Sequence, residues 1–170
     1  MRIITASLIA LSAAGAALAA PTHAPAPRVA AKSFDQLAKP LPLPYDEQAD
    51  AIKAVAAAKA KARAEHKLLL IDLGGNWCLD CRILAGTMAL PQVHQFVEKH
   101  YVEVTVDIGR FDKNLAIPQH YGIAKLAGVP AVIVVDPRTD RVINTGHAEA
   151  LADARSMNPQ ALADWLAQWT

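Results

Sequence analysis

The sequence of 170 residues has few cysteines, almost no net charge and no long apolar run beyond its first 20 residues. Two cysteines are too few to hold a small domain together by disulfides, and they stand three positions apart, so they point to a site. A formal net charge of +1 excludes the general basic field typical of nucleic-acid-binding proteins. No later segment has the roughly 18 uncharged apolar residues that a membrane-spanning helix requires.

The composition is that of a folded domain. Apolar residues make up 53% of the chain and charged residues 19%, which excludes intrinsic disorder for most of its length. Much of the apolar share is alanine, which buries little area per residue. We therefore expect the core to come from the Leu, Ile and Val runs.

Residues 1–20 have the features of a secretory signal peptide. Arg2 supplies a positive start, an Ala- and Leu-rich stretch follows, and Ala17-Leu18-Ala19 forms a small-x-small cleavage pattern. The alternative is an uncleaved membrane anchor, which the short, alanine-rich stretch disfavours, and no nearby cysteine supports a lipoprotein anchor. We expect a soluble, monomeric mature protein in the periplasm or secreted, where the state of a thiol pair matters.

Residues 21–45 differ in composition from the rest of the chain. They hold six of the 11 prolines, a pattern typical of extended, poorly packed chain. The sequence predicts a linker here that becomes ordered near Phe34 and Leu37, followed by one domain over 46–170.

The pattern from residue 46 onward predicts an α/β domain. Asp46 is a candidate helix cap, and uninterrupted apolar runs indicate strands buried on both faces. The expected helices cover 46–67, 78–90, 91–99, 114–121 and 158–169, and the expected strands cover 68–73, 101–107, 129–135 and 141–145. This order predicts a mixed central β-sheet flanked by helices.

The candidate site is Trp77-Cys78-Leu79-Asp80-Cys81, at a turn from a strand to a helix. Backbone N–H groups and the dipole at a helix start stabilise a thiolate, so Cys78 is the candidate nucleophile. Cys81 lies one helical turn further on, close enough to attack a mixed disulfide and resolve it. The spacing therefore favours redox chemistry.

Two other interpretations of the cysteine pair stay open. An inert local disulfide would constrain little of the unfolded chain, because its loop is so short. A zinc site would need two further ligands, and the candidate histidines are scattered, with no second CxxC or HxxxH pattern. These candidates are His94, His100, His120 and His147.

At these residues the sequence resembles the thioredoxin family over about residues 65–169. Asp72 stands six residues before Cys78 in a buried strand, and Trp77 directly precedes that cysteine. Arg82 follows the second cysteine. Val129-Pro130 stands before an apolar strand, as the family's cis-proline does. The resemblance implies the thioredoxin fold.

The resemblance also implies roles for the site residues. Asp72 would be a buried acid that passes protons to and from Cys81, with a pKa raised by desolvation. The alternative for Asp72 is an acid on an edge strand that points to solvent. Pro130 would face the disulfide and help to bind the backbone of the partner protein.

The chain looks closest to the thioredoxin-like C-terminal domain of the transmembrane disulfide reductase. The Asp80 anion disfavours the Cys78 thiolate, unless it points to water and is screened, so we predict a reductase of protein disulfides. A membrane thiol-electron donor would recharge it, without a cofactor. The alternatives are a disulfide oxidase or isomerase, or a copper- or haem-maturation partner that binds through the dithiol. Residues 146–157 exceed the family's usual link and have no expected function.

Overall fold

The computed structural model describes residues 23–170, so the predicted signal peptide over 1–20 lies outside the described residues. A four-stranded mixed sheet forms the centre of the domain, in the order β2-β1-β3-β4. Its strands are β1 (Leu68–Gly74), β2 (Tyr101–Asp107), β3 (Ala131–Asp136) and β4 (Arg141–Val142). β1 pairs in parallel with β2 and antiparallel with β3, and β3 pairs antiparallel with β4.

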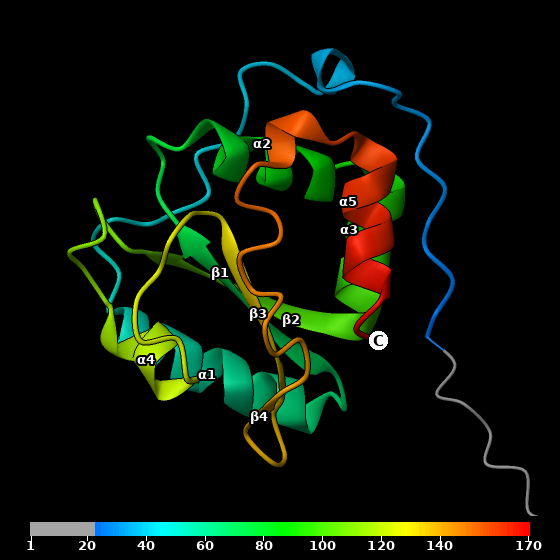
Figure 1. Cartoon of the computed structure of the whole chain (residues 1–170). Coiled ribbons are helices and arrows are strands. Elements are labelled where there is room, and N and C mark those ends of the chain that lie inside the picture. Colours follow the sequence, from blue (N-terminus) through cyan, green and yellow to red (C-terminus); the bar gives the residue numbers. More distant parts are fainter. Residues whose placement is uncertain (1–22) are drawn as a thin grey trace, which may run out of the picture.

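Helices cover both faces of this sheet (Figure 1). One face carries α2 (Leu79–Met88), α3 (Pro91–His100) and α5 (Pro159–Ala167), and the other carries α1 (Ala51–Ala64) and α4 (Ala116–His120). β1 and β3 are buried almost throughout, as a strand covered on both faces requires. The predicted α/β thioredoxin fold, with a mixed sheet flanked by helices, is confirmed.

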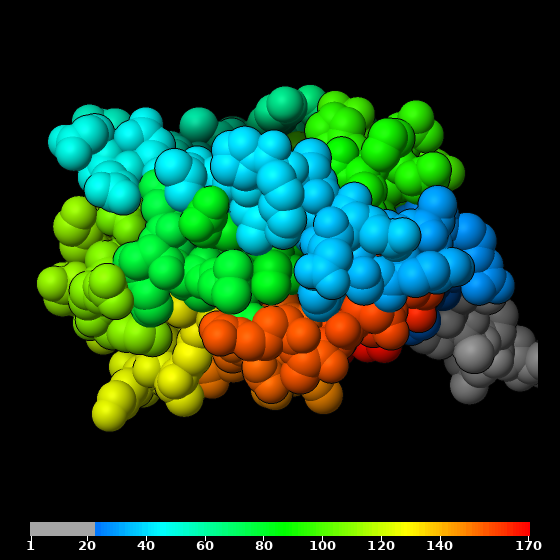
Figure 2. Space-filling model, turned by 90° about the horizontal axis from the view of Figure 1, so that it is seen from above, coloured from blue at the N-terminus to red at the C-terminus, as the bar shows by residue number. Residues whose placement is uncertain are grey.

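Residues 23–45 differ from the poorly packed linker that the prolines predict. The chain is extended apart from a short 3-10 helix (Phe34–Gln36), yet Val29 and Leu37 are buried in the core. Gly86 of α2 explains the close fit, because a Cβ there would lie 3.2 Å from the side chains of Leu37 and Leu41. Figure 2 shows this segment in light blue along the green α2. Proline leaves the chain extended, but apolar residues between the prolines still bury surface against a helix.

The largest differences from the predicted boundaries are at α1 and β4. Helix α1 starts at Ala51 with Asp50 as its N-cap, whose carboxylate accepts from the Lys53 N–H at 3.1 Å. Asp46 instead forms a separate turn, because its carboxylate accepts from the Gln48 N–H at 2.9 Å.

Strand β4 is shorter than the predicted 141–145, because the Asn144 side chain takes over the hydrogen bonds of a longer strand. Its amide oxygen accepts from the Val134 N–H at 2.9 Å, and its amide nitrogen donates to the Val132 carbonyl at 2.8 Å. Among the described helices none is long and apolar enough to cross a membrane.

Candidate active site

Cys78 and Cys81 form a disulfide at the start of α2, with their Cα atoms 5.3 Å apart. Cys78 is the N-cap of the helix, and its Sγ accepts from the Cys81 N–H at 3.1 Å. Its own N–H donates to the Gly75 carbonyl at 3.0 Å, which closes the turn that follows β1. Cys81 is fully buried while Cys78 keeps 5% exposure. The geometry therefore makes Cys78 the outer sulfur and Cys81 the inner one.

Trp77 is exposed beside the disulfide. Its indole N–H donates to the Gly109 carbonyl at 2.7 Å, and the Arg110 guanidinium lies 4.4 Å from the ring centroid. Phe111 packs at a tilt against the same indole, with ring centroids 6.2 Å apart. The loop after β2 thus holds the tryptophan in place, and 42% of its surface stays open.

The loop before β3 faces the outer sulfur. The Val129–Pro130 peptide bond is cis and both residues are buried. The Val129 carbonyl oxygen lies 3.5 Å from Cys78 Sγ. The residue before Pro130 therefore lies next to Cys78, while the role of Pro130 in substrate binding stays a prediction.

Asp72 lies in β1 between its two neighbouring strands, and only 1% of it is exposed. It is a buried acid, not an edge-strand acid that points to solvent. Burial and, less strongly, the nearby Glu103 charge raise the pKa of Asp72 to about 8. The Tyr45 hydroxyl donates a hydrogen bond to Asp72 Oδ1 at 3.0 Å, and this bond acts to lower the pKa of Asp72. The carboxyl therefore changes its charge near neutral pH, which suits a proton carrier.

Gly74 brings the Tyr45 hydroxyl and the inner cysteine together. A Cβ at Gly74 would overlap the Tyr45 hydroxyl and come within 2.7 Å of Cys81 Sγ. Asn76 fixes the tyrosine backbone, because its amide oxygen accepts from the Tyr45 N–H at 3.1 Å and its amide nitrogen donates to the Tyr45 carbonyl at 2.8 Å. Gly74 thus leaves room for the cluster of Asp72, Tyr45 and Cys81.

Asp80 is buried and paired with an arginine. Its side chain therefore does not point to water, and water does not screen its charge. Only 3% of the residue is exposed. Its carboxylate accepts a hydrogen bond from the backbone N–H of Arg155 at 2.8 Å. The Arg155 Nε donates to both carboxylate oxygens at 3.0 Å, and Nη2 also donates to Oδ2. The anion between the cysteines is therefore offset by a cation from a distant segment.

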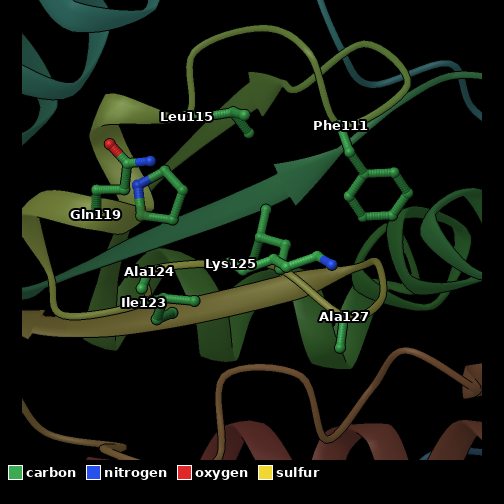
Figure 3. Close-up of a pocket in the computed structure, with 9 residues that line it drawn as sticks. Phe111, Leu115, Gln119, Ile123, Ala124, Lys125 and Ala127 are labelled. Atoms are coloured by element: carbon green, nitrogen blue, oxygen red, sulfur yellow. The ribbon is translucent and has the colours of Figure 1, made fainter.

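An apolar hollow of about 570 Å³ adjoins the tryptophan. Phe111, which contacts Trp77, closes one end of it, while Leu115 and Gln119 lie along one side and Ile123 along the other (Figure 3). The full lining consists of Phe111, Leu115, Pro118, Gln119, Ile123, Ala124, Lys125, Leu126 and Ala127. An apolar surface therefore continues from the exposed tryptophan.

The histidines considered as zinc ligands are not gathered at the cysteines. His94 pairs with Glu98 at 3.4 Å, and His120 pairs with Asp140 at 3.1 Å. Within residues 23–170, no three His, Cys, Asp or Glu side chains lie together as a metal site would require.

Several residues of the site have no local signal in the sequence. Tyr45 stands 27 positions before Asp72, and Arg155 stands 75 positions after Asp80. Only the fold brings these pairs together. Arg82, in contrast, is part of the motif, and it donates to the Leu41 carbonyl at 3.0 Å, which ties segment 23–45 to α2.

Comparisons with known proteins agree with this geometry. A family model described as thioredoxin-like matches residues 50–137. The crystal structure of disulphide isomerase from Xylella fastidiosa Temecula1 is 40% identical, with a TM-score of 0.70, over 75% of this chain and 97% of that one. A protein of unknown function from Pseudomonas aeruginosa is 19% identical with a TM-score of 0.39, over 71% of this chain and 84% of that one, which is too distant to carry an argument. No curated protein matches.

The fold, the disulfide-bonded cysteine pair and the similarity to a disulphide isomerase make this chain a thiol:disulfide oxidoreductase. The family model covers half of the chain, including β1, the cysteine pair and β3. The chain therefore belongs to the thioredoxin-like family.

Proposed function

We propose that the protein is an exported reductase of protein disulfides, active in the periplasm or secreted after removal of residues 1–20. The Cys78–Cys81 pair donates the electrons, and a membrane thiol-electron donor returns the pair to its reduced form. The protein acts as a monomer on polypeptides that carry exposed disulfides. This is the arrangement of the transmembrane disulfide reductase, to whose C-terminal domain the sequence looks similar.

The observation that carries the reducing direction is the Val129 carbonyl oxygen, 3.5 Å from Cys78 Sγ. A carbonyl accepts a hydrogen bond from a thiol but has nothing to donate to a thiolate, so it favours the protonated form. A strong oxidant needs an unusually stable thiolate in its reduced state. A less stable thiolate makes the reduced pair give up its electrons more readily.

The reaction takes two exchange steps. The Cys78 thiolate attacks one sulfur of the substrate disulfide, which forms a mixed disulfide and releases one substrate thiolate. Asp72 then accepts the proton of Cys81, and the Cys81 thiolate attacks Cys78 Sγ. This attack releases the second substrate thiolate and leaves the Cys78–Cys81 disulfide. Two electrons pass to the substrate, and its two sulfurs take up two protons.

The substrate chain lies along Trp77 and the apolar hollow next to it. The hollow begins at Phe111, whose ring contacts the exposed tryptophan that directly precedes Cys78. Apolar side chains beside a substrate cysteine gain free energy by leaving water there. A substrate in a partly unfolded state, whose apolar residues are exposed, fits this surface best.

The reduction potential of the Cys78–Cys81 pair tests the direction. Equilibration with glutathione buffers should give a value nearer to about −270 mV, typical of thioredoxin, than to about −120 mV, typical of a strong oxidant. A value in the oxidant range would exclude the reductase and leave the exchange chemistry intact.

Disulfide isomerisation is a second candidate, because the structure that is 40% identical to this chain is that of a disulphide isomerase. Isomerisation needs only the attack by Cys78 and a later attack by a substrate thiol, whereas net reduction needs Cys81 as well. The Cys81→Ser variant therefore separates the two. Recovery of native pairing in a protein with scrambled disulfides would survive this change if the protein is an isomerase.

A further inference from the structure

Segment 146–157 runs from the end of β4 to α5 and lies against the active-site end of the domain. In Figure 1 it is the orange chain that rises beside β3 toward α2 and includes a short 3-10 helix (Ala154–Ser156) next to α2. Figure 2 shows its orange side chains against the green α2. Leu151 and Ala154 are fully buried, and the Ala148 carbonyl accepts from the Val132 N–H at 2.7 Å. The segment is therefore fixed in place.

Its first contact with the site is the ion pair between Arg155 and Asp80. Three nitrogen atoms of Arg155, one from the backbone and two from the guanidinium, donate to the Asp80 carboxylate. The Asp80 side chain is 5% exposed, whereas the Arg155 side chain is 57% exposed. A buried carboxylate is costly without a partner, so the arginine both holds Asp80 in position and offsets its charge.

Its second contact is with the loop that leads to Pro130. The Glu149 carboxylate accepts from the backbone N–H groups of Ala127, at 2.5 Å, and Gly128, at 3.3 Å. A Cβ at Gly128 would lie 2.8 Å from the Ala152 Cβ, so the segment and the loop pack closely. This loop carries the Val129 carbonyl that faces Cys78 Sγ.

We propose that segment 146–157 connects the two sides of the disulfide, with Arg155 and Glu149 as positioning residues for thiol–disulfide exchange. Arg155 fixes the net charge next to Cys78 and thereby the reduction potential. Glu149 fixes the loop before Pro130 and thereby the binding of the substrate chain. The inference rests on the exchange chemistry of Cys78 and Cys81, and it holds for either direction of electron flow.

The charge argument gives an order of potentials. An unpaired anion beside Cys78 destabilises its thiolate and lowers the potential, and an unpaired cation raises it. Arg155→Gln leaves the Asp80 anion alone, and Asp80→Asn leaves the Arg155 cation alone. The double variant is neutral, as the native pair is. The expected order from high to low is Asp80→Asn, then native and double variant together, then Arg155→Gln.

The experiment equilibrates each protein with glutathione buffers. In this equilibrium the protein dithiol reduces glutathione disulfide, which yields the protein disulfide and two glutathione thiols. Each single variant should shift the equilibrium constant about fivefold to tenfold, and a tenfold shift corresponds to about 30 mV for this couple. Arg155→Lys keeps the positive charge and should return the potential toward the native value. Arg138→Gln, which removes an exposed arginine paired with Asp136, should leave the potential unchanged.

A merely structural role for the pair predicts a different pattern. Loss of packing would shift the reduction potentials of Asp80→Asn and Arg155→Gln in the same direction, and it would shift the potential of the double variant furthest. That pattern, or four equal potentials, overturns the proposal for Arg155. Only the order of the four potentials tests the role of Arg155. The absolute potential of the native protein tests the reductase assignment separately. Should Arg155→Gln fail to fold, Asp80→Asn and Arg155→Lys still test the order.

Glu149 has its own test, with reduced protein and a protein disulfide as substrate. Glu149→Ala frees the two backbone N–H groups and should raise KM about threefold to tenfold, with the potential unchanged. Glu149→Gln keeps an acceptor oxygen and should restore KM. Glu98→Ala, at an exposed glutamate of α3, is the matched control. A KM of Glu149→Ala equal to that of this control would overturn the proposal, because the connection needs both contacts.

Discussion

Segments 23–45 and 146–157 lie against the same helix, α2, but they reach different sides of the disulfide. Segment 23–45 ends at Tyr45, whose hydroxyl bonds Asp72 next to the buried Cys81. Segment 146–157 reaches Asp80, two residues after the outer Cys78. The first segment therefore touches the proposed proton carrier, and the second touches the charge beside the proposed nucleophile.

The two segments also use different interactions. Segment 23–45 packs through apolar side chains such as Leu37, and its hydrogen bonds to the site come from uncharged groups, the Tyr45 hydroxyl and backbone. Segment 146–157 contacts the site through the charged side chains of Glu149 and Arg155. Proton transfer and reduction potential can therefore change independently, by substitutions in separate parts of the chain.

The largest expected effect separates the two sulfurs themselves. Cys78→Ser should abolish reduction of an exposed protein disulfide, because the nucleophile is lost. Cys81→Ser should instead accumulate a mixed disulfide through Cys78, because the resolving thiol is lost. Non-reducing electrophoresis after incubation with substrate detects the covalent complex. Equal trapping by both variants would contradict the assignment of outer and inner roles.

Asp72→Asn comes next, with an expected slowing of turnover of about a hundredfold or more at pH 8, from the lower end of the range typical of a lost general base upward. Native turnover should rise as the pH passes through about 8, where the Asp72 carboxyl loses its proton. The asparagine variant should have a flattened profile there. Unchanged kinetics from pH 6 to pH 9 would show that Asp72 carries no proton.

The same variant should be more stable than the native protein. The folded state holds the Asp72 proton up to a pH of about 8, whereas the unfolded state loses it near the ordinary aspartate pKa of 3.8. Native stability therefore falls as the pH rises between these two values and is level above them. Asparagine does not titrate, so the gain in the free energy of unfolding should grow from pH 4 to pH 8. Urea unfolding at several pH values measures it.

Leu37→Ala tests whether segment 23–45 is part of the domain. Leu37 is 3% exposed, and its deletion should lower the free energy of unfolding by about 2–5 kcal/mol while the reduction potential stays native. Leu43 lies in the same segment with 64% exposure, so Leu43→Ala is the matched control and should change stability little. Equal stability of the two variants would show that the segment is a linker and does not stabilise the domain.

The predictable part of the molecule is local in sequence. The pattern around Trp77 and Cys78 predicted the turn and the helix start, because a helix N-terminus depends on a few consecutive residues. Apolar runs without alternation predicted the buried strands, and the resemblance to the thioredoxin family implied the burial of Asp72. These features need no knowledge of the rest of the chain.

The unpredicted part depends on contacts between distant positions. The proline content of residues 21–45 predicts extended chain, which residues 23–45 show, but it does not reveal that Gly86 leaves space for Leu37. Asp80 has an obvious charge in the sequence, but its partner Arg155 becomes visible only when the fold places segment 146–157 beside α2. The charge of a site therefore cannot be predicted from its motif alone.

Tyr45→Phe should have a small effect that is confined to the titration of Asp72. The Tyr45 hydroxyl donates to the Asp72 carboxylate and stabilises its charged form, so the pKa of Asp72 should rise above about 8 without it. Burial and the charge of Glu103 still act on the carboxyl in the variant. The midpoint of turnover against pH should therefore move upward, by up to about one unit, which corresponds to about 1.4 kcal/mol.

The matched control is Tyr121→Phe, which removes a tyrosine–aspartate hydrogen bond of 3.4 Å to Asp140, away from the cysteine pair. It should leave the midpoint where it is. The reduction potential of Tyr45→Phe should stay close to native, because the charge beside Cys78 does not change, whereas Arg155→Gln should lower the potential and leave the midpoint in place. Two outcomes would contradict this separation: a shifted midpoint of turnover in Arg155→Gln, or a reduction potential of Tyr45→Phe that shifts as far as that of Arg155→Gln. Either outcome would mean that the two segments act on one shared property of the site.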